Sequence, residues 1–123
     1  MITIKKITEE QARRAITTGE FSDELISSAT NVALILTQDW CPQWTAMAGW
    51  LDSWEEIDKP QDIDVDIFTL VYNKTPIERE FMKFKETVLN NYEIPYVRYY
   101  VNGEFIGDSN YLSRGEFIRR FKG

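Results

Sequence analysis

Apolar residues along this chain alternate between short continuous runs and runs at helical spacing. Residues 31–37 form a nearly unbroken apolar run, which is typical of a central strand that is covered on both faces. Apolar residues then recur at helical spacing, which predicts a helix that begins near Pro42 and ends at Lys59-Pro60. The stripe that this helix buries consists of Trp44, Met47, Leu51, Trp54 and Ile57.

The rest of the chain continues this alternation of strands and helices. Asn102-Gly103, between two short strands, is a strong signal for a two-residue hairpin turn. The other predicted elements are an edge strand over 2–7, a helix over 8–18 capped by Thr8, a helical turn over 21–25, strands over 63–72, 96–101 and 104–107, a helix from Pro76 with Phe81, Phe84, Val88 and Leu89 on its apolar face, and a last helix from Ser113 through Phe121. We predict an α/β fold in a single domain that spans residues 1–123, because no linker or repeat interrupts this order.

The charge balance narrows the classes of partner. The formal net charge is −6 over 123 residues, so we expect neither nucleic acid nor an anionic membrane surface as a partner, since both need clustered cations. The first residues lack the apolar stretch of a signal peptide and no run could span a bilayer, which predicts a cytoplasmic protein. The sequence has no histidine, which excludes Ser-His-Asp and Cys-His catalysis and removes the commonest nitrogen ligand of zinc.

Cys41 is the only thiol in the chain, and it lies between the predicted central strand and the helix that follows it. At a helix start, unpaired backbone N–H groups and the positive end of the helix dipole stabilise a thiolate over a thiol. Such a cysteine can attack a disulfide, but no second cysteine is present to resolve the product. The other interpretation is an inert cysteine, because free cysteine also packs well as a small hydrophobe.

Three segments together resemble the thioredoxin-like superfamily. Residues 32–44 match an apolar strand followed by Trp-Cys, residues 94–104 match Ile-Pro, a six-residue strand and an Asn-Gly turn, and residues 112–117 match the start of the last helix. The resemblance implies a thioredoxin-like fold, with a central mixed β-sheet flanked by helices. It also implies that the Ile94–Pro95 bond is cis and lies beside Cys41.

The chain departs from that superfamily at positions that matter chemically. Trp44 stands where the second, resolving cysteine is usual, and Ile35 stands where thioredoxins usually carry a buried Asp that handles protons. Asn110 replaces a usual glycine two residues before Leu112. These departures predict that the dithiol cycle of thioredoxin is lost.

The function predicted from this pattern is monothiol thiol–disulfide exchange, in which an external thiol resolves a mixed disulfide. The expected partners are protein or small-molecule thiols and disulfides, and no motif indicates a cofactor or a metal. Cys41 and Pro95 are the candidate catalytic residues. The candidate substrate-binding residues are Trp40, Pro42, Gln43, Trp44, Ile94 and Tyr96. The alternative is a redox-inactive binding module that uses the groove beside Pro95.

A third interpretation is a peroxidase of the single-cysteine peroxiredoxin type, in which a thiolate attacks peroxide. That family usually has Thr or Ser three residues before its cysteine, where this chain has Gln38. The incomplete motif makes this the weakest of the three interpretations.

Three side chains near the predicted site have competing interpretations. Trp44 lies on the helical stripe and is expected in the core, whereas Trp40 precedes the helix and is expected at the surface. Arg98 lies in a central strand and must reach solvent or an acid such as Asp64 or Asp66, because an unpaired buried guanidinium is very costly. We interpret Arg98 as half of a structural ion pair, and an anion site is the alternative.

Overall fold

A five-stranded mixed sheet forms the centre of the computed structural model, which describes residues 2–56 and 64–122. The strands are β1 (Ile2–Lys6), β2 (Asn31–Thr37), β3 (Val65–Val71), β4 (Tyr96–Val101) and β5 (Glu104–Ser109). Their order is β1-β3-β2-β4-β5, with β1, β3 and β2 parallel and with β4 and β5 each antiparallel to the strand before them in that order. The predicted places of β1 at an edge and β2 at the centre are confirmed.

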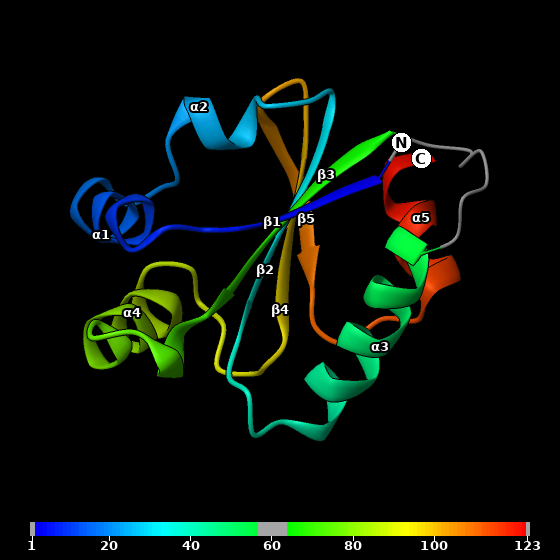
Figure 1. Ribbon diagram of the computed structural model, residues 1–123. Coiled ribbons are helices and arrows are strands. Elements are labelled where there is room, and N and C mark those ends of the chain that lie inside the picture. The colour runs from blue at the N-terminus through cyan, green and yellow to red at the C-terminus, as the bar shows by residue number, and fades with distance from the viewer. Residues whose placement is uncertain (1, 57–63, 123) are drawn as a thin grey trace.

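Helices cover both faces of this sheet. Figure 1 shows α1, α2 and α4 on one face and α3 and α5 on the other. The helices are α1 (Glu9–Thr18), α2 (Asp23–Ile26), α3 (Pro42–Glu56), α4 (Glu78–Thr87) and α5 (Arg114–Lys122), with a 3-10 turn η1 at Tyr72–Lys74. The fold is therefore α/β, with a central mixed sheet flanked by helices, as predicted.

The alternation of side chains along β2 divides the core into two clusters. Val32, Leu34 and Leu36 pack with the layer of α1, α2 and α4. Ala33 and Ile35 pack with the layer of α3 and α5. All five side chains are fully buried, which explains why the strand reads as a continuous apolar run.

Local capping signals place the helix ends where the sequence predicts them. The Thr8 hydroxyl accepts a hydrogen bond from the Gln11 N–H at 3.1 Å, and Gln11 Oε1 accepts one from the Thr8 N–H at 2.9 Å, which is a complete capping box. Gly19 ends α1 with a φ of 90°, a left-handed conformation that glycine adopts without steric cost. At α5, the Ser113 hydroxyl accepts from the Glu116 N–H at 3.4 Å.

The α4 region differs from the sequence-based expectation. The helix begins at Glu78 instead of Pro76, because η1 and a turn come between β3 and the helix. Val88, expected on the apolar face, is 50% exposed because it lies at the C-cap, whereas Leu89 is buried.

Other predicted boundaries also differ. β1 ends at Lys6 instead of residue 7, α2 spans Asp23–Ile26 instead of 21–25, and β3 spans Val65–Val71 instead of 63–72, of which residue 63 lies outside the described part of the chain. β5 runs to Ser109, two residues beyond its predicted end at 107. The predicted end of α3 at Lys59-Pro60, together with Ile57 and the side chain of Trp54, lies outside the described part of the chain.

The β4–β5 hairpin supplies a stability test. Asn102 and Gly103 have φ values of 53° and 77°, and a Cβ on Gly103 would lie 2.5 Å from the Ser27 hydroxyl oxygen. Gly103→Ala should therefore lower the free energy of unfolding by about 1 kcal/mol. Gly49→Ala, inside α3 where an added Cβ meets nothing within 4 Å, should raise it by about 0.5–1 kcal/mol. Urea denaturation measures both, and equal stability of the two variants would contradict this account of the turn.

Candidate functional site

Cys41 lies at the junction between β2 and α3. Its carbonyl accepts the first helical hydrogen bond of α3, from the Thr45 N–H at 3.1 Å, so Cys41 occupies the cap position of this helix. Its thiol donates to the Ile94 carbonyl, with a distance from Sγ to oxygen of 3.6 Å. The Ile94–Pro95 peptide bond is cis. The structure thus brings Cys41 and the Ile94–Pro95 pair together across 53 residues of chain.

Two residues of η1 hold the segment that precedes Cys41. Asp39 accepts a hydrogen bond from Asn73 Nδ2 at 2.6 Å, and its N–H donates to Asn73 Oδ1 at 3.1 Å. The Lys74 ammonium lies 2.8 Å from Asp39 Oδ2. Hydrogen bonds from Lys74 and then Asn73 hold the pKa of Asp39 below its ordinary value. The chain therefore leaves β2 in a defined direction before it reaches Cys41.

The indole of Trp40 is held although it is exposed. Trp40 is 66% exposed, as predicted, and its Nε1–H donates to Gln38 Oε1 at 2.7 Å. Gln38 Nε2 in turn donates to the buried Tyr72 hydroxyl at 3.2 Å. These two hydrogen bonds orient an aromatic surface next to the thiol.

A pocket of about 480 Å³ contains Cys41 on its wall. The Cys41 side chain is only 6% exposed, so the pocket is its access to solvent. The lining residues are Trp40, Cys41, Gln43, Tyr92, Glu93, Ile94, Asn110 and Tyr111. Of the predicted site residues, the pocket therefore brings together Trp40, Cys41, Gln43 and Ile94.

Sequence reasoning missed four of these lining residues. Tyr92 and Glu93 directly precede Ile94-Pro95, a position that could have identified them. Asn110, which replaces the glycine usual in thioredoxin-like sequences, signalled that this loop is different, and Tyr111 follows it. Tyr92 is 73% exposed and Tyr111 is 42% exposed, so two exposed aromatic rings besides Trp40 line the pocket.

A pair of amide side chains joins the loop before Pro95 to the loop after β5. Asn110 Nδ2 donates to Asn91 Oδ1 and to the Pro95 carbonyl, both at 3.1 Å, and Asn91 Nδ2 donates to Asn110 Oδ1 at 3.3 Å. Asn91 also accepts from the Lys85 ammonium, at its carbonyl oxygen (3.0 Å) and at Oδ1 (3.3 Å). The wall of the pocket opposite α3 is therefore cross-linked by polar contacts.

Lys85 is a buried cation behind this wall. It is 1% exposed, and its ammonium lies 5.7 Å from the centre of the Tyr96 ring. Burial lowers the pKa of Lys85 to about 8, and the negative charges of Glu86 and Glu93 offset only part of that effect. Both oxygens that it contacts are neutral, so no close carboxylate counteracts the desolvation.

Arg98 forms an ion pair, as predicted, but its partner is Glu20 and neither Asp64 nor Asp66. The Arg98 guanidinium is 2.9 Å from Glu20 Oε2, in the connection between α1 and α2. Asp66 lies on β3, which β2 separates from β4, and it accepts a hydrogen bond from the Ser28 hydroxyl at 2.8 Å. The spacing of residues in the sequence cannot show which acidic side chain of a loop contacts Arg98 on the sheet.

Tyrosine hydroxyls complete the surroundings of Arg98. Its guanidinium donates to the hydroxyls of Tyr100 (2.9 Å) and Tyr96 (3.0 Å), which in turn donate to Glu20 (2.9 Å) and Asp108 (2.7 Å). Burial acts to lower the pKa of Arg98, but Tyr100, Glu20 and Tyr96 outweigh it and the pKa is raised. Burial, followed by the hydrogen bond to Asp108, raises the pKa of Tyr96 to about 12. With all these donors engaged, Arg98 serves the structure and does not form an open anion site.

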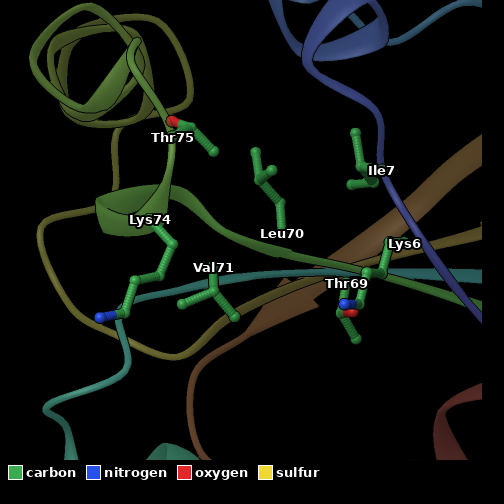
Figure 2. Close-up of a pocket in the computed structure, with 7 residues that line it drawn as sticks. All are labelled: Lys6, Ile7, Thr69, Leu70, Val71, Lys74 and Thr75. Carbon is green, nitrogen blue, oxygen red and sulfur yellow. The ribbon is translucent and has the colours of Figure 1, made fainter.

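A second hollow, of about 330 Å³, is lined by Lys6, Ile7, Thr69, Leu70, Val71, Lys74 and Thr75. Figure 2 shows the Lys74 amine directed away from Leu70 and Ile7, and this amine pairs with Asp39. No lining residue is a nucleophilic thiol or a carboxylate. Within residues 2–56 and 64–122, no cluster of acidic or Cys side chains could hold a metal ion, and no helix is long and apolar enough to cross a membrane.

Solved structures resemble this chain over nearly its whole length. Oxidised thioredoxin O1 from Arabidopsis thaliana has a TM-score of 0.65 at 13% identity and covers 98% of this chain and 96% of its own. Thioredoxin F from spinach chloroplast has a TM-score of 0.62 at 12% identity, over 98% of this chain and 91% of its own. A mutant thioredoxin from Halobacterium salinarum has a TM-score of 0.54 at 13% identity, over 98% of this chain and 86% of its own. The chain has the thioredoxin fold. No protein-family model and no curated protein matches its sequence.

Three predicted binding residues lie elsewhere on this thioredoxin fold. Tyr96, expected at an aromatic rim, is fully buried because α4 covers its face of the sheet and its hydroxyl is engaged by Asp108. Trp44 is half-buried against the cluster around Met47, as its place on the helical stripe predicts, and it faces β1 instead of the pocket. Pro42 is exposed at the first position of α3 but does not line the pocket.

The buried Lys85 should make the free energy of unfolding of this protein depend on pH. Its pKa is about 8 in the folded protein, against an ordinary value of 10.5, so between these values the unfolded chain binds more protons and stability rises with pH. From pH 8 to pH 10, the free energy of unfolding of the wild type should rise by about 2 kcal/mol relative to Lys85→Met. Urea denaturation across this range measures it. Lys83→Met, an exposed lysine on the same helix, serves as the control, and parallel profiles for wild type and Lys85→Met would refute the prediction.

Proposed function

We propose that this protein carries out thiol–disulfide exchange through Cys41 alone, with an external thiol as the resolving group. The observation that supports it most is the placement of the thiol at the cap of α3, against the cis Ile94–Pro95 bond and on the wall of an open pocket. The chain shares its fold with solved thioredoxins, which supports thiols or disulfides as partners in general.

The reaction has two balanced steps. In the first, the Cys41 thiolate attacks one sulfur of a partner disulfide, a new S–S bond forms, and the other partner sulfur leaves as a thiolate. In the second, an external thiolate attacks the mixed disulfide, releases the Cys41 thiolate, and keeps the first partner as a disulfide. No net oxidant or reductant is needed beyond the two partners.

The residues around the thiol have different roles in this exchange. Cys41 lies at the cap of α3, next to the positive end of the helix dipole. Pro95 forms the cis peptide bond with Ile94, and Ile94 presents the carbonyl that the thiol contacts at 3.6 Å. Trp40 and Gln43 line the entrance and are the predicted contacts to a partner. The proposal includes a cytoplasmic location, where thiols are kept reduced.

Cys41→Ser tests the proposal directly. Folded wild type incubated with hydroxyethyl disulfide should gain one mixed-disulfide adduct, and Cys41→Ser should gain none while keeping its circular dichroism spectrum. The proposed role as nucleophile predicts that Cys41 reacts faster in the folded protein than in the urea-unfolded chain at the same pH. Intact mass spectrometry of acid-quenched samples measures both rates. Slower reaction in the folded protein would identify Cys41 as an inert buried thiol and would favour the binding module.

Trp44→Cys tests the explanation for the missing dithiol cycle. On the thioredoxin fold, a cysteine three residues after Cys41 should form an internal disulfide on oxidation, seen as a loss of two hydrogens in the intact mass. The lost packing of a half-buried indole should cost about 1–3 kcal/mol of stability. The variant Trp50→Cys, a further residue of α3, should form no internal disulfide with Cys41. Failure of Trp44→Cys to form one, in a protein that is still folded, would contradict the assignment of this position.

A further inference from the structure

We propose that the pocket beside Cys41 selects disulfides that carry positive charge next to the sulfur, such as peptides with Arg or Lys beside a cysteine. This inference rests on the exchange function proposed above and names its substrate class. Three observations support it: the exposed aromatic rings at the pocket, the polar contacts that hold them, and the charges on the lining.

Three of the eight residues that line the pocket carry exposed aromatic rings. Trp40, Tyr92 and Tyr111 are 66%, 73% and 42% exposed, and all three line the pocket that contains Cys41. Burial of large aromatic rings is normally favourable, so three of them left in solvent around one pocket indicate a surface for a partner. The faces of such rings attract cations, and Trp attracts them best.

The segments that carry these rings are held in place before any partner binds. The Trp40 indole is fixed by its hydrogen bond to Gln38. Tyr92 and Tyr111 each follow one member of the Asn91–Asn110 pair, whose side chains are joined by two hydrogen bonds. Because the indole of Trp40 and the segments that carry the two tyrosines are held in place, less conformational freedom is lost on binding, which favours recognition.

The charge on the pocket lining favours a cation over an anion. Glu93 is the one charged residue among the lining side chains, and it is exposed. No Lys or Arg lines the pocket. Lys85 acts on Glu93 through space, but its ammonium is buried and bonded to Asn91, so it cannot contact a ligand. The net charge of −6 adds a field of the same sign.

The same lining disfavours glutathione as the preferred partner. Glutathione disulfide carries several carboxylates at neutral pH, and carboxylates are held in proteins by Arg, Lys or backbone N–H groups at helix starts. Here no Lys or Arg lines the pocket, and Pro42 removes one of the N–H groups at the start of α3. A cationic peptide disulfide meets no such obstacle.

Three matched disulfides test this selectivity. They are the symmetric disulfides of acetyl-Xaa-Cys-Xaa-amide in which Xaa is Arg, Gln or Glu, and their rates of mixed-disulfide formation at Cys41 are read by intact mass at pH 7. Each rate is divided by that of the same disulfide with N-acetylcysteine amide, which removes differences in intrinsic reactivity. We expect the Arg disulfide to be favoured over the Glu disulfide by about tenfold at low salt, with Gln between them, and the ratio to shrink in high salt.

Variants then assign the preference to the pocket. Glu93→Gln should slow the Arg disulfide by about two- to fivefold and leave the Gln disulfide unchanged, and Tyr92→Leu should act in the same direction. Glu104→Gln is the matched control, because it removes the same charge at the far end of the sheet, where Glu104 pairs with Val101 and Val101 with Asn31. It should behave as wild type.

The outcomes separate the two proposals. Equal normalised rates for all three disulfides, or equal effects of Glu93→Gln and Glu104→Gln, would overturn the selectivity while leaving exchange at Cys41 intact. No adduct at Cys41 with any of the three, including the neutral Gln disulfide, would overturn the exchange function itself and the selectivity with it.

Discussion

Burial of β2 on both faces is the constraint from which the rest of this structure follows. The strand has hydrogen-bonded neighbours on each side, β3 and β4, and five fully buried apolar side chains that point alternately to the two faces. A strand of this kind needs a helical layer on each face, which α1, α2 and α4 supply on one side and α3 and α5 on the other (Figure 1). Because β2 cannot slip or fray, the segment that follows it and carries Cys41 starts from a defined place.

The antiparallel register between β2 and β4 explains why the thiol meets Pro95. Leu36 pairs with Tyr96, so the end of β2 and the start of β4 lie at the same edge of the sheet. Strong local signals encode both strands: an unbroken apolar run for β2, and Asn102-Gly103 at the far end of β4. The thioredoxin fold and the meeting of Cys41 with Ile94–Pro95 could therefore be predicted from the sequence. The side of β4 on which Tyr96 points was also predictable, but α4 covers that face, so the ring is in the core and not at a rim.

Contacts between loops could not be predicted in this way. Arg98 pairs with Glu20 across 78 residues, and Asn91 pairs with Asn110 across 19, and both depend on how two irregular segments lie over the sheet. The hydrophobic periodicity that predicts strands (two residues) and helices (3.6 residues) carries no information about contacts between two loops. Arg98 and Lys85, both buried, show what these contacts do. Arg98 meets a carboxylate, so its pKa is raised despite burial, whereas Lys85 meets only neutral amide oxygens and its pKa falls to about 8.

The loss of an internal resolving thiol changes what the pocket must do. In a dithiol protein the second cysteine attacks the mixed disulfide and releases the partner, so no external thiol has to enter the pocket. The pocket therefore selects a partner once in each cycle. In the proposed mechanism the mixed disulfide persists until an external thiolate attacks the partner's sulfur, which is bonded to the 6%-exposed Cys41 at the wall of the pocket. The same side chains, Trp40 and Tyr92 among them, therefore control both the first partner and the thiol that releases it. Selectivity acts twice in each cycle, and the partner that fits the pocket best is also the one that most hinders its own release.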